Sequence, residues 1–273
     1  MSNKIKIISF NVNGIRARIN QLTSVINQHQ PDIIGLQETK VCNEEFPFED
    51  IEALGYKASI HGQKGHYGVA LLTKISPSSL QCGFPGDDSD SQCRIIHGKY
   101  EINGRSLHVI NGYFPQGEGR HHPTKFPAKQ KFYRDLLDYL NNNFNQDDAV
   151  VVMGDMNVAH RDADVGIKPE NAKRWLKTGK SSFLPEEREW LQSILDWGLI
   201  DTYRADNPEN NTYSWFDYRS RGFDQDPKIG LRIDLILASS ATMAICSGTG
   251  IDLDARGHEK PSDHCPIWLD INL

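Results

Sequence analysis

The chain has 273 residues, of which 38% are hydrophobic, so it can form one large domain or two small ones. Its formal net charge of −6 argues against a protein that binds polyanions regardless of sequence, but it is compatible with a nucleic-acid enzyme that has local basic loops. The sequence holds no linker-like tract and no run of 18 apolar residues. We therefore expect one domain over residues 1–273 and no membrane span.

Five cysteines are odd in number and irregular in spacing. This pattern predicts neither a disulfide framework nor a zinc site. Free thiols in a reducing compartment are the simpler interpretation. Because the first residues also lack an apolar stretch of signal-peptide length, we expect a cytoplasmic protein.

The predicted elements mix strand pairs with isolated helices. A strand over 4–12 comes first, and a helix over about 19–29 follows and ends before Pro31. Further strands are predicted near 32–39, 56–61, 68–73, 94–102, 106–114, 149–153, 232–238 and 265–271, and further helices over about 127–144 and 185–197. Strands and helices do not alternate strictly. An α/β fold of two mostly antiparallel or mixed sheets, packed face to face with helices outside, is therefore favoured over a doubly wound parallel sheet.

The segment after the apolar run 149–153 carries the strongest local signal. Gly154 would let the backbone turn where the strand stops, and Asp155 and Asn157 would face the same way if the chain stays extended. A carboxylate and a carboxamide aimed out of one sheet edge suit a hard cation or a phosphate. The alternative is an ordinary strand-to-loop turn, in which Asp and Asn are common.

Similar polar residues recur at other strand ends. They are Asn11, Asn13, Glu38, Asp263 and His264. Asp234 lies within a further apolar run, where a lone buried carboxylate is costly unless it is paired, and His264 is the natural partner. Each of these residues taken singly is more often structural, so the prediction depends on their joint occurrence.

Their chemistry suits metal-assisted hydrolysis of a phosphodiester. Glu38, Asp155 and Asp263 offer the oxygen ligands that Mg²⁺ prefers, and waters and a substrate phosphate would complete its shell. Asn157 can donate a hydrogen bond to an oxyanion, and an Asp–His pair can activate or orient a nucleophile. Tyr113 would by default be a core residue, but it shares a strand face with a polar neighbour two positions earlier, so its phenol could reach a phosphate.

Longer motifs identify a family. They include SFNVNGIRAR, IGLQETK, INGYFPQGE, MGDMN, SFLPEEREW, SWFDYRSRGFD and EKPSDHCP. In these motifs, from Lys6 to about Trp268, the chain resembles the exonuclease III family of abasic-site endonucleases, within the endonuclease/exonuclease/phosphatase superfamily. LQET, GDMN and SDH are shared across the superfamily, whereas SFLPEEREW and SWFDYR are more specific. The resemblance implies a four-layered α/β sandwich and dependence on Mg²⁺, with Mn²⁺ able to substitute.

The resemblance also implies a role for each matching residue. Glu38 would be the main metal ligand and Asp263 would complete the metal site, with Asp155 and Asn157 as further contacts. Asn13 stands where some relatives carry Asp, and would be a weaker or water-mediated ligand. Among the catalytic residues, Asp155 would transfer a proton and Asn157 would stabilise the transition state. Asp234 would orient His264. His264 and Tyr113 would contact the phosphate, and Asn11 would hydrogen-bond within the site. Whether Asp155 or a Tyr113 phenolate handles the nucleophile stays open.

The resemblance places two groups of residues at the DNA. Trp215, Leu231 and Ile233 would wall a pocket for a flipped abasic sugar, from which a normal nucleotide is excluded by its base; the alternative is plain core. The basic residues near loops would contact phosphates and position the duplex. They are Arg16, Arg18, Lys125, Lys129, Arg219 and Arg221.

The implied enzyme is a monomeric DNA repair nuclease. It would incise on the 5′ side of abasic sites to leave a 3′-hydroxyl, trim duplex DNA from 3′ ends and remove 3′-blocking phosphates. One alternative is an inositol-phosphate or phospholipid phosphodiesterase, against which the two specific motifs argue. The other is a DNA-binding protein without catalysis, and the presence of all the catalytic residue types argues against it.

Overall fold

The computed structural model describes residues 4–273 and arranges their strands in two six-stranded sheets. The first sheet has the order β11-β12-β1-β2-β4-β3 and the second has the order β5-β6-β7-β8-β10-β9. The first comprises β1 (Lys4–Asn11), β2 (Ile33–Gln37), β3 (Lys57–His61), β4 (Val69–Thr73), β11 (Cys246–Ile251) and β12 (Ile267–Asn272). The second comprises β5 (Ser79–Cys82), β6 (Ile95–Ile102), β7 (Arg105–Tyr113), β8 (Val150–Asp155), β9 (Leu199–Asp201) and β10 (Asp234–Ser239).

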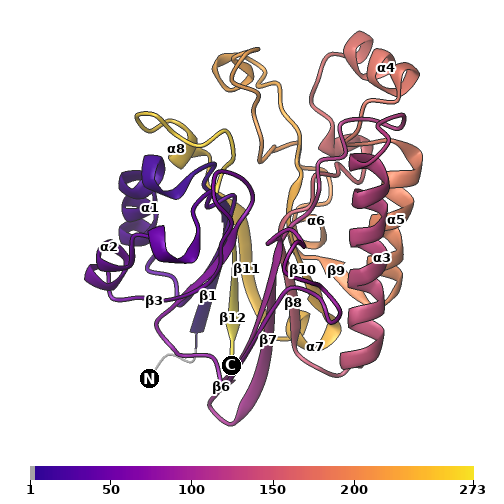
Figure 1. Cartoon of the computed structure of the whole chain (residues 1–273). Coiled ribbons are helices and arrows are strands. Elements are labelled where there is room, and N and C mark those ends of the chain that lie inside the picture. The colour runs from indigo at the N-terminus through magenta and orange to yellow at the C-terminus, as the bar shows by residue number, and fades with distance from the viewer. Residues whose placement is uncertain (1–3) are drawn as a thin grey trace.

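Each sheet is mixed and contains one parallel pair. The parallel pairs are β1–β2 and β7–β8, and the remaining neighbours are antiparallel. Helices cover the outer faces, with α1 and α2 on the first sheet and α3 and α5 on the second (Figure 1). The helices are α1 (Ile15–His29), α2 (Phe48–Ala53), α3 (Lys125–Asn143), α4 (Pro169–Thr178), α5 (Pro185–Asp196), α6 (Thr202–Asp206), α7 (Ser240–Met243) and α8 (Leu253–Arg256). The expected four-layered α/β sandwich is confirmed.

The alternation of side chains along each strand feeds three apolar layers. In β8, Val151 and Met153 face the core between the two sheets, whereas Val150 and Val152 face α3 and α5. Both faces of the strand are therefore buried, which explains its uninterrupted apolar sequence. β1 divides in the same way, with Ile7 toward the inner core and Phe10 toward α1.

The structure corrects the sequence-based prediction where apolar patterning was weak. The short strands β5, β9 and β11 and the helix α4 were not predicted, since β5 is exposed throughout and α4 buries no residue. The first helix begins at Ile15 rather than near residue 19, directly after Gly14, whose φ is 100°. No helix within residues 4–273 is both long and apolar enough to cross a bilayer.

Candidate active site

The polar strand ends predicted from sequence meet at one end of the sandwich. Asn11 ends β1, Glu38 follows β2 directly, and Asp155 ends β8. Asp234 begins β10 and pairs with Asp155 across the antiparallel β8–β10 ladder. His264 precedes β12, which runs antiparallel to β1, so it enters the same edge. The predicted residues from both sheets are therefore brought together between the sheets.

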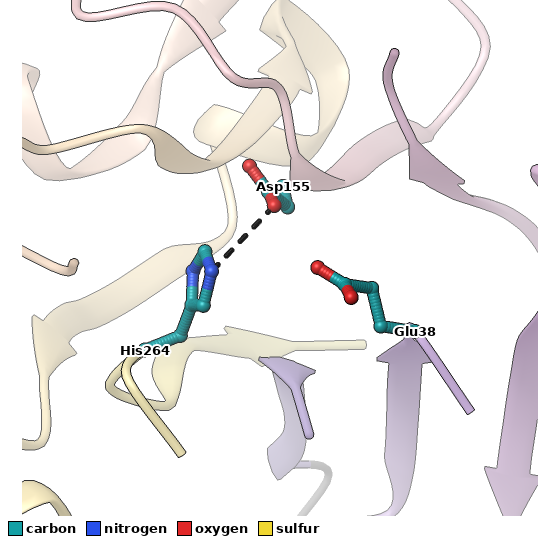
Figure 2. Close-up of side chains that lie close together, drawn as sticks. All are labelled: Glu38, Asp155 and His264. Atoms are coloured by element: carbon teal, nitrogen blue, oxygen red, sulfur yellow. Dashed lines mark ion pairs between the residues drawn. The ribbon is translucent and has the colours of Figure 1, made fainter. Parts of the chain in front are cut away.

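One amide group joins two of the carboxylates. Nδ2 of the fully buried Asn11 donates to Oε1 of Glu38 and to Oδ2 of Asp155, at 2.9 Å in each case. The side chains of Glu38, Asp155 and His264 point toward one another (Figure 2), and one ligand atom from each lies within 4.8 Å of the others. Two carboxylates and an imidazole at this spacing could hold a divalent cation.

The two carboxylates differ in how strongly they hold a proton. Burial raises the pKa of Glu38, but the Lys40 ammonium, 3.0 Å from Oε2, and the hydrogen bond from Asn11 outweigh it, so the pKa is lowered. Burial raises the pKa of Asp155 to about 8, and the charges of Asp234 and Glu38 act in the same direction against the opposing effect of His264. Asp155 is thus the carboxylate suited to exchanging a proton near neutral pH.

The predicted pairing of Asp234 with His264 is present. His264 Nδ1 lies 3.0 and 2.9 Å from the two carboxylate oxygens of Asp234, and Ser214 Oγ donates to Asp234 Oδ2 at 2.7 Å. His264 Nε2 lies 3.7 Å from Asp155 Oδ2. Burial lowers the pKa of His264, but the charges of Asp234 and Asp155 outweigh it and raise the pKa to about 10. The ring is held in one orientation as a cation.

Asp263 and Asn13 form a second group beside this cluster. Asn13 Nδ2 donates to Asp263 Oδ1 at 2.8 Å, and Trp215 Nε1 donates to Asp263 Oδ2 at 3.0 Å. Lys40 donates to the side-chain oxygen of Asn13. Of the described residues, only Glu38, Asp155 and His264 form an acidic cluster with metal-ligand spacing. Direct metal ligation by Asp263 or Asn13 therefore stays a prediction. In the structure, Asp263 accepts a hydrogen bond from Trp215 and Asn13 accepts one from Lys40.

Of the two alternatives for residues 155–157, the structure has the turn and not the extended chain. Asn157 has a left-handed backbone with φ of 54°, and its N–H donates to Asp155 Oδ1 at 3.0 Å. Its Nδ2 donates to the Phe114 carbonyl at 2.9 Å, and its own carbonyl accepts from Lys129 at 2.9 Å. Asn tolerates this conformation better than most residues. The turn, rather than strand alternation, sets the direction of the carboxamide.

Tyr113 ends β7 opposite Asp155 in the parallel β7–β8 register. Burial raises the pKa of its phenol well above 10, and the nearby charges of Glu38 and Asp155 raise it further, while the Arg94 guanidinium, 4.8 Å from the ring centre, acts in the opposite direction. The phenol therefore stays protonated. This geometry favours a hydrogen-bond donor over a phenolate nucleophile.

The three predicted wall residues share one pocket. Trp215, Leu231 and Ile233 line a cavity of about 470 Å³ together with Asn157, so the pocket adjoins the carboxylate cluster. Its lining also includes part of α4 and the segment that follows it, which sequence reasoning missed. The residues concerned are Asn171, Arg174, Trp175 and Lys180. The signal available was the i, i+4 spacing of Asn171 and Trp175, which share one helix face.

The predicted DNA contacts divide into exposed and buried residues. The exposed residues are Arg16, Lys125, Arg219 and Arg221. Three of them already face an acid, in the pairs Arg16–Glu45, Lys125–Glu118 and Arg221–Asp224. Arg18 Nη2 lies 3.4 Å from the Tyr218 hydroxyl. Lys129 is a correction, because it is fully buried and cannot contact a phosphate from its place inside α3. The sequence signal for this burial is the spacing of Lys129, which stands three or four positions from Phe126, Phe132 and Tyr133 on the apolar face of α3.

Comparisons with known proteins cover nearly the whole chain. A family model described as Endonuclease/Exonuclease/phosphatase family matches residues 8–264. Exodeoxyribonuclease III of Haemophilus influenzae is 56% identical over 267 residues, covering 97% of this chain and 99% of that protein. An AP endonuclease from Archaeoglobus fulgidus has a TM-score of 0.89 at 32% identity, covering 98% of this chain and 100% of that one. A 3′ phosphatase from Neisseria, solved with a product DNA hairpin, has a TM-score of 0.88 at 34% identity with the same coverage.

Proposed function

The chain belongs to the endonuclease/exonuclease/phosphatase family, and we propose that its site hydrolyses the DNA phosphodiester on the 5′ side of an abasic site, aided by Mg²⁺. It is a DNA repair nuclease by its similarity to exodeoxyribonuclease III and AP endonucleases. One observation carries the proposal: the Glu38–Asp155–His264 cluster adjoins a pocket walled by Trp215, Leu231 and Ile233. An apolar wall beside a phosphoryl-transfer cluster suits a sugar that has lost its base.

The same site would serve three related reactions. The relatives include an exodeoxyribonuclease and a 3′ phosphatase bound to a product DNA hairpin. Abasic incision, 3′-to-5′ trimming of duplex DNA and removal of 3′-blocking phosphates all hydrolyse an ester of a 3′-oxygen. We infer that duplex DNA with an abasic site or a blocked 3′ end is the partner, and that one domain of residues 1–273 acts as a monomer.

The family depends on a divalent metal, and the donor set here fits a hard cation. Glu38 is held ionised, and its oxygens lie close to those of Asp155. We propose that these two residues hold Mg²⁺, with Mn²⁺ as a substitute, and that Asp263, Asn13 and Asn157 contribute through bound water. When bound, the ion supplies positive charge that stabilises the phosphate oxygens.

The chain's own residues divide the remaining work. Asp155 would accept the proton of the attacking water, whose oxygen forms a bond to phosphorus as the bond to the upstream 3′-oxygen breaks. The 3′-oxygen takes up a proton from solvent water and leaves as the 3′-hydroxyl, and Asp155 then releases its proton to solvent. His264, held by Asp234, would face the phosphate as a cation, and Asn157 and Tyr113 would donate hydrogen bonds to it. Asn11 keeps the two carboxylates at their spacing.

The pocket and the basic loops would position the DNA. Trp215, Leu231 and Ile233 would cover the apolar faces of a flipped sugar, and a base would not fit beside them. The basic residues around the site would contact phosphates without reading sequence. They are the half-buried Arg18 and the exposed Arg16, Lys125, Arg219 and Arg221.

The test is cleavage of an end-labelled duplex that carries one tetrahydrofuran abasic analogue. We expect a single cut on the 5′ side of the analogue with Mg²⁺, and none with EDTA or in the Glu38→Gln variant. The same duplex without the analogue controls for nicking at intact nucleotides. If the folded wild-type protein leaves the abasic duplex intact with Mg²⁺ present, another phosphodiester is the substrate.

A further inference from the structure

Behind the pocket wall, two helices bury an ion pair that the mechanism above does not use. Lys129 of α3 and Glu187 of α5 are both 0% exposed, and Nζ lies 2.6 Å from Oε1. Removing two charges from water is costly, and apolar residues of similar size often give equal or greater stability. Stability alone is therefore a weak explanation for this pair.

Lys129 reaches from α3 to the backbone of the site. Its Nζ donates to the Asn157 carbonyl at 2.9 Å and lies 3.4 Å from the Gln116 carbonyl. Asn157 has a left-handed backbone, so the orientation of its peptide decides where the carboxamide points. Tyr133, one turn further along α3, donates its hydroxyl to the adjacent Met156 carbonyl at 2.7 Å. Hydrogen bonds from α3 thus fix the backbone carbonyls of Met156 and Asn157, the two residues that follow Asp155.

Glu187 fixes another segment of the pocket lining. Its Oε2 accepts from the backbone N–H groups of Ser182 and Leu184, at 2.8 Å in both cases. Ser182 has a φ of 117°, which a serine rarely adopts without external support. Ser182, Gln116 and Asn157 all line the pocket. The ion pair consequently ties three separate segments of the pocket lining to one another.

We propose that Lys129 and Glu187 are positioning residues for the hydrolysis, which hold Asn157 and the adjoining pocket wall in their reactive arrangement. The inference rests on the proposed function, since it assigns Asn157 a partner in the reaction. Neither residue touches the substrate, because both lie wholly beneath the surface. A displacement of Asn157 by about 1 Å is enough to cost on the order of a hundredfold in rate.

The first experiment removes the charges while keeping the backbone contacts of Glu187. The variant Lys129→Met/Glu187→Gln leaves an amide oxygen for the N–H groups of Ser182 and Leu184 and leaves no buried ion without a partner. On the abasic duplex we expect kcat to fall at least about tenfold while KM changes less than about twofold. Lys131→Met, which removes an exposed lysine from the same helix, is the matched control and should keep wild-type kcat.

The second experiment asks whether the pair acts through Asn157. In an Asn157→Ala background, the double variant should lower kcat less than about twofold further, because the group that it positions is already gone. Wild-type kcat in the folded double variant, or effects that multiply in full with Asn157→Ala, would overturn the proposal.

A readout without catalysis separates this inference from the proposed function. Hydrogen exchange of residues 155–158 should be faster in the double variant than in wild type and Lys131→Met. Unchanged exchange there overturns the positioning role even if the wild-type protein proves inactive on abasic DNA. Conversely, an active wild type together with a fully active double variant retains the proposed function and removes only the inference. If the double variant does not fold, Lys129→Gln/Glu187→Gln, which also leaves no buried ion without a partner, is carried through the same three measurements.

Discussion

Asp155 accepts hydrogen bonds from two asparagines and lies beside a cationic histidine, yet its pKa is raised. Asn11 and Asn157 both donate to the carboxylate, which favours the ionised form. Burial and the charges of Asp234 and Glu38 prevail over those bonds and over His264. A carboxyl whose pKa is raised in this way is suited to binding and releasing a proton near neutral pH.

We predict that Asp155→Asn abolishes turnover without abolishing binding. An amide cannot accept the proton of the attacking water, so kcat on the abasic duplex should fall by roughly 10²–10⁴-fold. Binding of the same duplex, measured by fluorescence anisotropy, should change little because the pocket and basic loops are untouched. The exposed Asp90→Asn serves as control. Wild-type activity in Asp155→Asn would remove Asp155 from the mechanism.

At the scale of the element, β8 shows why a glycine stands before Asp155. The sequence suggested that Gly154 ends the strand, but the strand runs through it to Asp155. Its φ is 146°, and a Cβ at this position would lie 1.9 Å from the Gly112 carbonyl oxygen of β7. Glycine is required here by close approach of the parallel β7–β8 pair next to the site, and not by a turn.

Gly154→Ala should therefore destabilise the protein strongly. Backbone strain and the clash with Gly112 together should lower the free energy of unfolding by more than about 3 kcal/mol in urea titration. Gly55→Ala is the matched control, since Gly55 also has a positive φ, of 86°, but a Cβ there meets nothing within 4 Å. That variant should lose only about 1–2 kcal/mol. If Gly154→Ala and Gly55→Ala lose equal stability, the close approach of β7 does not explain the requirement for glycine at position 154.

The β6–β7 hairpin carries a half-buried histidine pair that contacts α3. His97 Nε2 lies 3.0 Å from His108 Nδ1, and His97 Nδ1 lies 2.9 Å from the Tyr139 hydroxyl. Burial, with a smaller contribution from the charge of His108, lowers the pKa of His97 to about 4. Burial also lowers the pKa of His108; the Lys99 charge acts with it, and the Asp148 and Glu101 charges act against it.

The pKa of His97 is lower in the folded chain than in the unfolded chain. The contribution of this residue to the free energy of unfolding is therefore fully present above about pH 6.5. Its contribution is lost as the pH falls toward 4, since the unfolded chain then binds a proton that the folded chain does not. The slope from one such histidine is at most about 1.4 kcal/mol per pH unit. We predict that His97→Gln flattens the loss of stability between pH 6.5 and 4, as measured by urea unfolding. The exposed His121→Gln should leave the slope unchanged; an unchanged slope in His97→Gln would contradict the assignment.

At the scale of the whole molecule, the protein has a net charge of −6, although its proposed partner, DNA, is itself a polyanion. The exposed basic residues near the site are few, and three of them face acids within the chain. Arg219 lines the pocket, and its side chain makes no ion pair within residues 4–273. It is therefore available to a phosphate, as is Arg174 of the same pocket lining.

We predict that Arg219→Ala weakens the salt dependence of DNA binding. In an Asp155→Asn background, which prevents cleavage, the slope of log Kd against log salt should decrease by about one phosphate contact. Arg134→Ala, on the exposed face of α3 and outside the pocket lining, is the control. A slope equal to that of the parent protein would place Arg219 away from the DNA backbone.

The sequence by itself determined the chemistry of the site and the class of fold. Apolar runs predict the strands, because strand periodicity depends only on neighbouring residues. The polar residues at the ends of these runs, such as Glu38, Asp155 and His264, could therefore be recognised as candidates from the sequence. The GDMN and SDH motifs depend on neighbours a few positions away. The family followed from longer motifs of the same local kind, and the structure confirmed the mixed two-sheet sandwich.

Only the tertiary structure decided which of these residues act on one another. Asn11 bridges Glu38 and Asp155, which lie 27 and 144 positions away, and Lys129 is buried because α5 packs beside α3 with Glu187 facing it. The α4 wall of the pocket and the left-handed turn at Asn157 also depend on packing between segments. The physical reason is that a hydrogen bond or a buried charge is fixed by its partner in space, and that partner leaves no mark on the local pattern of the chain.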